Sequence, residues 1–442
     1  MNATSSSVRL GAMDLYHPLP CPNGWTTRRL RFVTQINKAQ PIALSPEDEV
    51  SFVPMAAIGE HGGIQLDQVK ALDEIGDGYT YFADGDVVVA KITPCFENGK
   101  GAFAESLKNG IAFGTTELHV IRPAQDIDGR FLFYLTISEL FRKLGEGAMY
   151  GAGGQKRVPD QFIKDFQALV PPLDQQQKIA AFLDRKTAEI DTLIAKKRWL
   201  LDRLAEKRTA LITCAVTKGL NPDAPMKDSG IEWLGEIPAH WDVMAVKFVL
   251  AMPITDGPHE TPFLVDEGIP FLSAEAVNND ALDFSKKRGL ISEDDDVRFS
   301  QKYRPKLGDV YIVKSGATTG KVARVETCDR FNIWSPLAAL RPNKNKMSTN
   351  FLFCYAKSKS FTSAIEIGWN YGTQQNIGMG ALSNLDIAVP PIKEQENIAD
   401  FVEANLDKTR DVVEKVEQAI EKLQEYRSAL ITNAVTGQIR VA

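Results

Sequence analysis

The chain has 442 residues, of which 44% are hydrophobic and 24% charged, and a formal net charge of −6 at pH 7. It is too long for one hydrophobic core, so two to four domains are expected. The negative charge argues against a protein that binds nucleic acid over its whole surface, but it is compatible with a local basic face.

The sequence carries no signal for a membrane or for an oxidising compartment. No apolar run approaches the roughly 20 residues that cross a bilayer. The first ten residues are Ser-rich and lack the apolar core of a signal peptide. The five cysteines are scattered without metal-ligand or redox spacing, so free thiols in a reducing cytoplasm are predicted.

Residues 1–170 are predicted to form a first globular domain. A turn at Gly85-Asp86 precedes the apolar run 87–90, which indicates a buried strand. A further strand is expected at 118–122, and a helical period follows over 131–144. Strands and helices without a regular βαβ alternation favour an α+β fold.

Two loops of this domain carry residues suited to DNA contact. Phosphates are bound by Lys, Arg and hydroxyl groups, and base edges are read by Arg, Lys, Gln and Asn. The loop after the buried strand supplies Lys91, Thr93 and Lys100, and the loop at the glycine-rich segment supplies Tyr150, Gln155, Lys156 and Arg157. The alternative is that these are ordinary turns with solvated lysines.

Residues 171–220 are predicted to form a long helix. They open on Pro171-Pro172, and no Gly or Pro interrupts 174–216. About 43 residues at roughly 1.5 Å per residue give a rod of about 65 Å. Seven of ten heptad a and d positions are apolar, which indicates a coiled-coil seam. The ten positions are Ile179, Leu183, Lys186, Ile190, Leu193, Lys197, Leu200, Leu204, Lys207 and Leu211.

Residues 221–389 are predicted to form a second globular domain on the same plan, after a linker at 221–229. Asp309 and the following apolar run correspond to Asp86 and its strand. The equivalent candidate DNA contacts are Lys314, Ser315, Thr318 and Lys321 in one loop, and Tyr371, Gln374, Gln375 and Asn376 in the other.

Residues 390–442 repeat 171–220 at an offset of 219 residues without a gap. Pro390-Pro391 opens the copy, and the octet 429–436 matches 210–217 at seven of eight positions. Eight of ten a and d positions are apolar. These positions are Ile398, Val402, Asn405, Thr409, Val412, Val416, Ala419, Leu423, Tyr426 and Leu430. A repeat of this length indicates two copies of one structural unit.

The charges of the two helices favour pairing within one chain. Residues 171–220 carry ten Lys/Arg and six Asp/Glu, a net charge of +4, whereas 390–442 carry seven and ten, a net charge of −3. The order globule, helix, globule, helix predicts an antiparallel pair with the globules at opposite ends, related by a pseudo-two-fold axis. The alternative is two separate amphipathic helices, each capping its own domain.

The sequence contains no recognisable catalytic motif. The nearest phosphate loop, 315–321, begins with Ser instead of Gly, and its lysine is followed by Val322. The glycine pairs at 145–153 lack the βαβ context of a dinucleotide fingerprint. No segment matches the Asn/Asp-Pro-Pro-aromatic pattern of amino-methyltransferases, and the five histidines do not cluster. The chain therefore offers no self-sufficient catalytic or metal site.

With these features the chain resembles a known family, the specificity subunits of type I restriction–modification systems. The resemblance covers essentially the whole length. It is carried by the doubled Pro-Pro…Ile-Ala-x-Phe starts, the doubled Ala-Leu-Ile-Thr-x-Ala-Val-Thr ends, Thr187-Ala188-Glu189-Ile190, and Leu234-Gly235-Glu236-Ile237-Pro238.

This resemblance implies a non-catalytic subunit that reads double-stranded DNA. Domains 1–170 and 221–389 would be target-recognition domains for the halves of a bipartite, asymmetric site, and 171–220 and 390–442 would be helical spacers. Partners would be two methylation subunits, which use S-adenosylmethionine to methylate adenine, and restriction subunits that use ATP and Mg²⁺. No cofactor is expected in this chain. Two rival hypotheses remain: an isolated methyltransferase or nuclease, and a coiled-coil scaffold that does not bind DNA.

Overall fold

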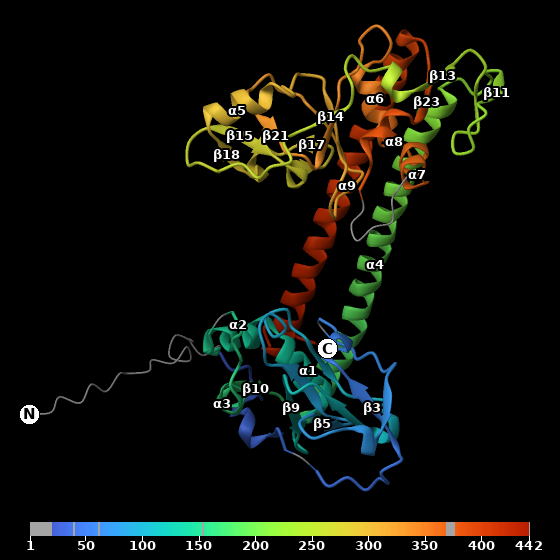
Figure 1. Ribbon diagram of the computed structural model, residues 1–442. Helices are drawn as coiled ribbons and strands as arrows, with labels where there is room; N and C mark the ends of the chain where they lie inside the picture. Colours follow the sequence, from blue (N-terminus) through green and yellow to red (C-terminus); the bar gives the residue numbers. More distant parts are fainter. Residues whose placement is uncertain (1–19, 39, 61, 153, 368–375, 442) are drawn as a thin grey trace, which may run out of the picture. The chain divides into compact units, whose positions relative to one another are not determined.

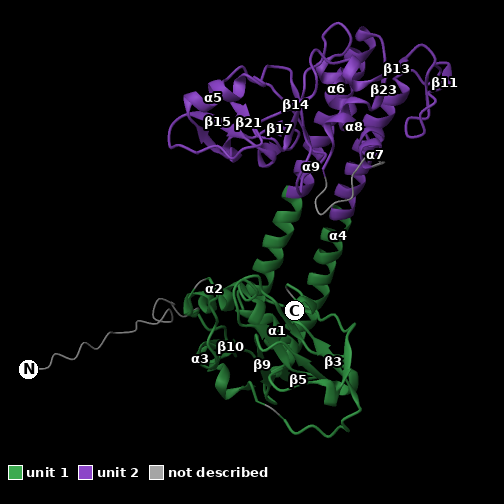
Figure 2. Cartoon of the chain, in the orientation of Figure 1, with its two compact units in different colours: residues 1–197, 418–442 green, residues 198–417 purple. Residues whose placement is uncertain are grey.

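The computed structural model describes residues 20–38, 40–60, 62–152, 154–367 and 376–441, and the chain divides into two compact units (Figures 1 and 2). The first unit comprises residues 1–197 and 418–442, and the second comprises residues 198–417. Helix α4 (Leu173–Lys218) leads from the first unit into the second, and α9 (Ile392–Val435) leads back. Each unit thus joins one predicted globular domain to parts of both long helices.

The first unit is a mixture of short strands and short helices. Its strands are β1 (Thr26–Arg29), β2 (Thr34–Ile36), β3 (Glu49–Val53), β4 (Val69–Ala71), β5 (Thr80–Ala83), β6 (Val87–Ala90), β7 (Gly101–Phe103), β8 (Ile111–Gly114), β9 (Leu118–Pro123) and β10 (Gln167–Val170). Its helices, besides the long pair, are α1 (Gly129–Ile137), α2 (Glu139–Ala148) and α3 (Asp160–Asp165).

Two four-stranded sheets organise this unit. The order is β2-β9-β6-β7 in an antiparallel sheet and β4-β3-β8-β5 in a mixed one, in which β3 and β8 are parallel. The central strand β6 is buried at all four positions, as its apolar run predicts. A separate pair, β1 and β10, brings the first strand of the domain beside the last before α4.

The second unit has a comparable list of elements. Its strands are β11 (Met226–Asp228), β12 (Glu236–Pro238), β13 (Asp242–Ala245), β14 (Thr255–Asp256), β15 (Ile269–Leu272), β16 (Val277–Asn278), β17 (Ala281–Leu282), β18 (Gly289–Ile291), β19 (Val310–Val313), β20 (Val322–Arg324), β21 (Asn332–Ile333), β22 (Leu337–Leu340) and β23 (Asp386–Val389). Its shorter helices are α5 (Glu293–Ser300), α6 (Thr349–Ala356), α7 (Lys359–Ile367) and α8 (Met379–Ser383).

The strand topology repeats that of the first unit. The sheet β14-β22-β19-β20 is antiparallel and corresponds to β2-β9-β6-β7. The sheet β18-β15-β21 contains the parallel pair β15 and β21, which corresponds to β3 and β8. The antiparallel pair β13 and β23 corresponds to the pair β1 and β10 of the first unit. The α+β architecture with two long helices is confirmed.

Each unit has one main core that takes in both long helices. In the first unit Ile179 and Leu183 of α4 share a core with Ile431 and Ala434 of α9. In the second unit the roles exchange, so that Ile398 and Val402 of α9 share a core with Ile212 and Ala215 of α4. The start of each helix therefore packs with the terminal octet of the other. This excludes the alternative in which each helix caps its own domain separately.

The strict heptad frame predicts some seam positions wrongly. In the first half of α4 one line of buried positions runs through Ile179, Leu183, Thr187, Ile190 and Ile194, with steps of four, four, three and four residues. The predicted seam residue Leu193 is 43% exposed, and Tyr426 in α9 is 56% exposed. An α-helix has 3.6 residues per turn, so a frame of 3.5 drifts by about 20° per heptad unless the helices supercoil fully.

A glycine in the left-handed conformation follows each octet. Gly219 has φ of +74° and Gly437 has φ of +69°. A Cβ atom on Gly437 would lie 2.5 Å from Pro22 and 3.3 Å from Trp25, and one on Gly219 would lie 3.2 Å from Trp241. Glycine is needed at both places because the turn that leaves the helix runs directly against an indole ring.

Candidate nucleic-acid interface

The two candidate loops of the first unit meet at the end of β6. The backbone N–H of Val158 donates to the carbonyl of Lys91 at 2.8 Å, and that of Thr93 donates to Lys156 at 3.0 Å. Arg157 forms isolated bridges with both Ile92 and Tyr150. The segments around residues 91 and 157 therefore form one surface at the end of the central sheet.

The predicted contact residues differ in how free their side chains are. Tyr150 is 67% exposed, and Gln155 and Lys156 are also exposed. Arg157 is paired with Glu117 at 2.8 Å, and this hydrogen bond from the guanidinium lowers the pKa of the Glu117 carboxyl. Lys100 is half-buried and donates to the carbonyl of Met55 at 3.2 Å.

Lys91 and Thr93 are also half-buried, on the strand side of the junction. The hydroxyl of Thr93 donates to the carbonyl of Lys156 at 3.2 Å, which ties the two loops together a second time.

The second unit builds the same junction from different residues. Ile377 N–H donates to the carbonyl of Lys314 at 2.8 Å, and Ser315 bridges to Asn376. These pairs correspond to Val158 with Lys91 and to Arg157 with Ile92 in the first unit. Two loops distant in sequence are joined at one sheet end in both halves of the chain.

The candidates of this unit are placed in three different ways. Lys314 is 9% exposed, with its Nζ 3.1 Å from Oδ2 of Asp256. Lys321 is exposed, and Thr318 lies in the turn that precedes it and accepts its N–H at 3.1 Å. Tyr371, Gln374 and Gln375 lie outside the described residues. Roles in DNA contact stay predictions for all of these residues and for their counterparts in the first unit.

A buried ion pair fixes the central strand at the opposite end from the junction. Arg122 of β9 donates to both carboxylate oxygens of Asp86 at 2.7 and 2.6 Å. Arg341 binds Asp309 in the same bidentate way, at 2.7 Å for each bond. Each aspartate is 1% exposed. The doubled Gly-Asp turn and Arg-Pro strand end in the sequence were the signal for this pair, which sequence reasoning did not connect.

The buried side chain of His119 binds the loop that contains Val158, next to the junction in the first unit. A carbonyl oxygen only accepts, so Nε2 carries the hydrogen and donates to Val158 O at 2.8 Å. Nδ1 then accepts from the Asn37 amide at 3.1 Å. Burial lowers the pKa of His119; the bond to Val158 and the charges of Glu117 and Asp160 oppose this shift, and Lys91 adds to it.

The first unit is therefore expected to lose stability in mild acid. The folded-state pKa of His119 lies below the unfolded value of about 6.5, so the unfolded chain takes up the proton first. The stabilisation is fully present above about pH 6.5 and is lost as pH falls toward the folded-state pKa. Thermal unfolding from pH 7.5 to 5.5 checks this. His119→Gln, which keeps a donor and does not titrate, should show a flatter pH dependence, and equal slopes would contradict the assignment.

A buried glutamine attaches each globular domain to the start of its helix. The Gln176 amide oxygen accepts from Asp128 N–H at 2.7 Å, and its nitrogen donates to the carbonyls of Pro171 and Asp126 at 2.8 and 3.1 Å. Gln395 makes the same three bonds, to Ser348, Pro390 and Lys346. The two glutamines are 219 residues apart, so the repeat itself could have identified them.

The octet of each helix attaches to the domain of the other repeat. The hydroxyl of Thr432 in α9 accepts from the N–H of Glu139, the first residue of α2, at 3.0 Å. The hydroxyl of Thr213 in α4 accepts from the N–H of Lys359, the first residue of α7, at 2.8 Å. The matching octets thus satisfy an otherwise unpaired N–H at a helix start in each unit.

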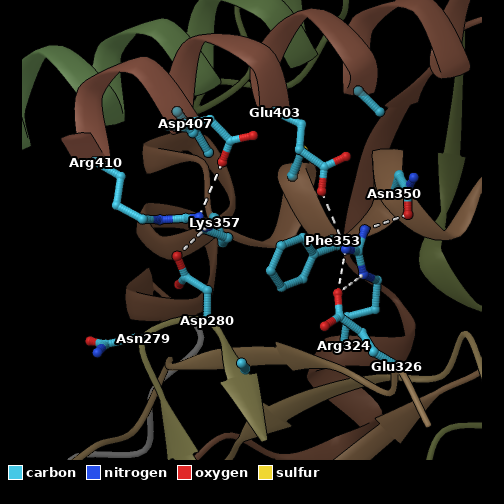
Figure 3. A pocket seen from close by; sticks show the side chains of 14 residues that line it. Asn279, Asp280, Arg324, Glu326, Asn350, Phe353, Lys357, Glu403, Asp407 and Arg410 are labelled. Atoms are coloured by element: carbon cyan, nitrogen blue, oxygen red, sulfur yellow. Dashed lines mark hydrogen bonds and ion pairs between the residues drawn. The ribbon is translucent and has the colours of Figure 1, made fainter.

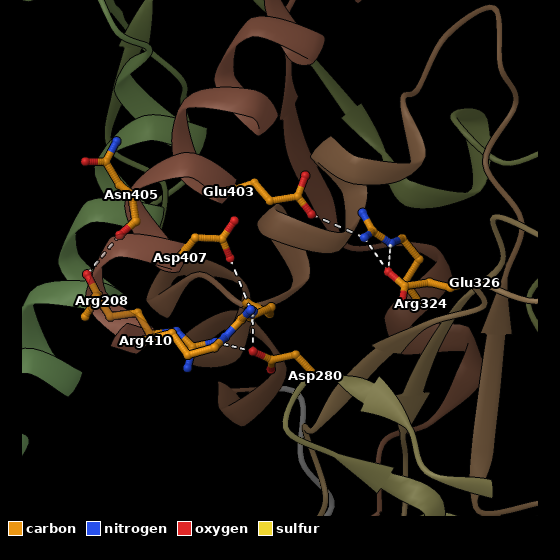
Figure 4. A network of polar contacts seen from close by, with 10 residues as sticks. Arg208, Asp280, Arg324, Glu326, Glu403, Asn405, Asp407 and Arg410 are labelled. Atoms are coloured by element: carbon orange, nitrogen blue, oxygen red, sulfur yellow. Dashed lines mark hydrogen bonds and ion pairs between the residues drawn. The ribbon is translucent and has the colours of Figure 1, made fainter. Parts of the chain in front are cut away.

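In each unit one arginine of the globular domain pairs with two carboxylates, one in the same domain and one on the long helix that follows that domain. In the first unit Arg130 bridges Glu105 at 2.5 Å and Asp184 of α4 at 3.3 Å. In the second unit Arg324 pairs with Glu326 and lies 3.3 Å from Glu403 of α9 (Figures 3 and 4). The carboxylates correspond, but the arginine comes from α1 in one unit and from β20 in the other.

A cavity of about 390 Å³ lies beside Arg324 in the second unit (Figure 3). Asp280, at the turn of the β16–β17 hairpin, binds Lys357 at 2.6 Å and also pairs with Arg208 of α4 (Figure 4). Burial raises the pKa of Asp280, but the two cations outweigh it and lower the pKa overall. The charges around the cavity are paired with one another, so it is a structural contact and not a candidate DNA site.

No three His, Cys, Asp or Glu side chains of the described segments are grouped to hold a metal ion. In the same segments no helix has the length and apolarity needed to cross a bilayer.

Known proteins resemble this chain in sequence. A family model, the type I restriction modification DNA specificity domain, matches residues 22–199 and 253–422. The specificity subunits of the type I restriction enzymes EcoAI and EcoEI of Escherichia coli are 43% and 36% identical over 164 and 201 residues. These matches cover 37% and 44% of this chain but only 28% and 34% of the relatives. The MjaVIII specificity subunit of Methanocaldococcus jannaschii is 23% identical over 440 residues, covering 96% of this chain and 95% of the relative.

Solved structures share the fold. A chain from a structure described as "Structural basis underlying complex assembly and conformational transition of the type I R-M system" has a TM-score of 0.73 at 19% identity, covering 96% of this chain and all of that one. The HsdS subunit from Thermoanaerobacter tengcongensis has a TM-score of 0.52 at 19% identity, covering 96% and 99%. Since the family model matches most of the sequence, the chain belongs to the type I restriction modification DNA specificity family.

Proposed function

We propose that this chain is the DNA-recognition subunit of a type I restriction–modification complex. Each unit would read one half of a bipartite, asymmetric site in double-stranded DNA. The observation that carries the proposal is the junction of two loops at the same sheet end in both units, held by Lys91 and Val158 in one and by Lys314 and Ile377 in the other. The frame is the same, but the exposed residues on it differ, as reading of two different half-sites requires.

Catalysis would belong to the partners. Two methylation subunits would bind S-adenosylmethionine and transfer its methyl group to adenine, and restriction subunits would use ATP and Mg²⁺. The names of the relatives support assembly of this kind, because each is a specificity subunit of a type I restriction enzyme. The contribution of this chain would be to bind the duplex and to position the partners on it.

The function is tested by reconstituting the chain with the methylation subunits encoded in its host. Sequencing of methylated adenines should then reveal one bipartite motif, and gel-shift of the complex should show preference for that motif. A complex that assembles but neither methylates nor shifts DNA would favour a coiled-coil scaffold. Cofactor binding by the isolated chain would favour an isolated methyltransferase or nuclease.

The paired helices are proposed to set the spacer between half-sites. Inserting four residues near Thr187 should lengthen α4 by roughly 6 Å, a little under two base-pair steps of about 3.4 Å. Thr187 is buried and lies 3.2 Å from the Tyr134 hydroxyl, and Ile194 belongs to the core of the first unit, so the insertion is better placed after Lys197, where that unit's part of α4 ends. A matched insertion in α9 after Glu417 keeps the helices aligned. The variant should methylate sites with a spacer longer by one or two base pairs.

The control for the insertion replaces residues 195–198 by alanine without changing the length. It should keep the original spacer. If methylation mapping of the lengthened variant returned the original spacer, or new half-site bases, then the helices would not set the distance.

A further inference from the structure

A group of basic side chains in the second unit surrounds one fully buried carboxylate. Asp256 is 0% exposed and is the last residue of the edge strand β14. Its Oδ2 lies 3.1 Å from Lys314 Nζ and 3.0 Å from His259 Nε2, and its Oδ1 pairs with Lys302. Two lysines against one aspartate leave a local charge of +1 with the histidine neutral, on a chain whose net charge is −6.

The local fold holds these groups in place. Lys302 Nζ also donates to the carbonyl of Gly257 at 3.1 Å. A Cβ atom on Gly257 would lie 1.8 Å from the Ile333 carbonyl, so the strand passes directly against β21. The indole N–H of Trp334 donates to Glu260 O at 3.1 Å and fixes the loop that carries His259.

The cations are open to solvent on the side away from Asp256. The side chains of Lys302 and His259 are 48% and 69% exposed, whereas Lys314 is almost covered. Lys314 is also the residue whose carbonyl anchors the loop junction through Ile377. The basic group therefore adjoins the surface on which the candidate reading loops meet.

Among the described residues of the first unit, no buried carboxylate lies at the end of the corresponding edge strand. Asn37 follows the edge strand β2, and its amide contacts the His119 ring instead of a lysine. In the second unit the Asp256 carboxylate therefore brings Lys302 and Lys314 close together and neutralises part of their charge.

We propose that Lys302 and His259, held by Asp256 together with Lys314, form a binding site for a backbone phosphate of the DNA at the second half-site. Asp256 limits the strength of this contact, so that it positions the duplex without capturing unrelated sequence. This inference rests on the proposed function. It adds Lys302 and His259 to the predicted DNA contacts. Lys314, which is almost covered, would pair with Asp256 and hold it in place without touching the DNA itself.

The test measures DNA affinity of the reconstituted complex with its methylation subunits across a series of salt concentrations. Loss of one phosphate contact reduces the slope of log K against log salt by about 0.9. Lys302→Ala should reduce the slope by close to that amount, whereas His259→Ala, which removes a hydrogen-bond donor, should lower the affinity with a smaller change of slope. Affinity for cognate and unrelated duplexes should fall by a similar factor of about three to ten at low salt, leaving the specificity ratio unchanged.

Asp256→Asn should have the opposite effect. With the carboxylate charge removed, affinity for unrelated DNA should rise and the salt slope should steepen, which lowers the specificity ratio. The matched control is Lys344→Ala, since Lys344 is an exposed lysine in the turn beyond the opposite end of β22. Thermal unfolding identifies any variant that has lost its fold, and Lys302→Arg should retain the wild-type slope.

The outcomes separate this proposal from the function on which it rests. If Lys302→Ala matches Lys344→Ala while the complex still selects its bipartite site, the phosphate site is wrong and the recognition function stands. If the slope falls only for cognate DNA, Lys302 reads a base and the phosphate assignment is wrong. If the wild-type complex does not distinguish its site from unrelated DNA, the recognition function fails as well.

Discussion

Asp309→Ala is expected to lower the free energy of unfolding of the second unit by about 3 kcal/mol, within the range for breaking a buried ion pair. The substitution leaves Arg341, whose side chain is 21% exposed, without its bidentate partner. It also removes the acceptor for the Tyr303 hydroxyl at 2.5 Å and for the Lys306 N–H at 2.9 Å. Chemical denaturation, following the transition of the second unit, measures the change.

Asp329→Ala is the control for this prediction, because Asp329 is an exposed aspartate of the same unit. It should change the unfolding free energy by no more than about 0.5 kcal/mol. Replacing Asp309 by Leu and Arg341 by Met together should recover part of the loss, since an apolar pair leaves no buried charge unpaired, while the Tyr303 hydroxyl and the Lys306 N–H still lack their acceptor. An Asp309→Ala variant as stable as the control would show that the pair does not hold the strand.

Gln176→Ala is expected to destabilise the first unit by about 3 kcal/mol. Three hydrogen bonds are lost, so the N–H of Asp128 and the carbonyls of Pro171 and Asp126 lose their partner. Each unsatisfied buried group costs about 1–3 kcal/mol, and partial relaxation of the structure reduces the sum of these costs. Chemical denaturation, following the transition of the first unit, measures this change. In the proposed complex, methylation that depends on the first half-site should fail at a lower temperature than with the wild-type chain.

The neighbouring Gln177 supplies a closely matched control. It has the same side chain, lies one residue further along α4 and is exposed. Gln177→Ala should be nearly neutral. Two variants of equal stability would mean that the Gln176 bonds are replaced by water and do not attach the domain to α4.

Several parts of the fold follow from local patterns. The predicted range 171–220 lies within two residues of α4 at each end, and the start of α9 was predicted equally well, because a proline pair precedes each helix. The predicted range 390–442 extends seven residues beyond Val435, where α9 ends. The strand after each Gly-Asp turn was predicted because a short apolar run with valine is typical of a buried strand. The helical period over 131–144 is interrupted in the structure, since Ser138 ends α1 and caps α2 through a bond from Phe141 N–H.

The candidate site was only partly accessible in this way. Residue type and recurrence indicated the two loops in each half, but not that they are joined, because their contact spans more than sixty residues of sequence. Lys302 and His259 were not singled out, since isolated charged residues have no periodicity and no copy in the first half. Asp86 and Asp309 were noted as the residues before the buried strands, but their pairing with Arg122 and Arg341 was not foreseen.

By itself, the sequence of this protein determined that it is a double repeat with two long helices, each preceded by an α+β domain. Such features arise from local backbone preferences and from identity at a constant offset. Only the tertiary structure decided which helix face is buried, that each octet docks on the domain of the other repeat, and that Lys314 turns toward Asp256. Those outcomes depend on contacts between distant segments, where packing and charge pairing outweigh any preference of the residue alone.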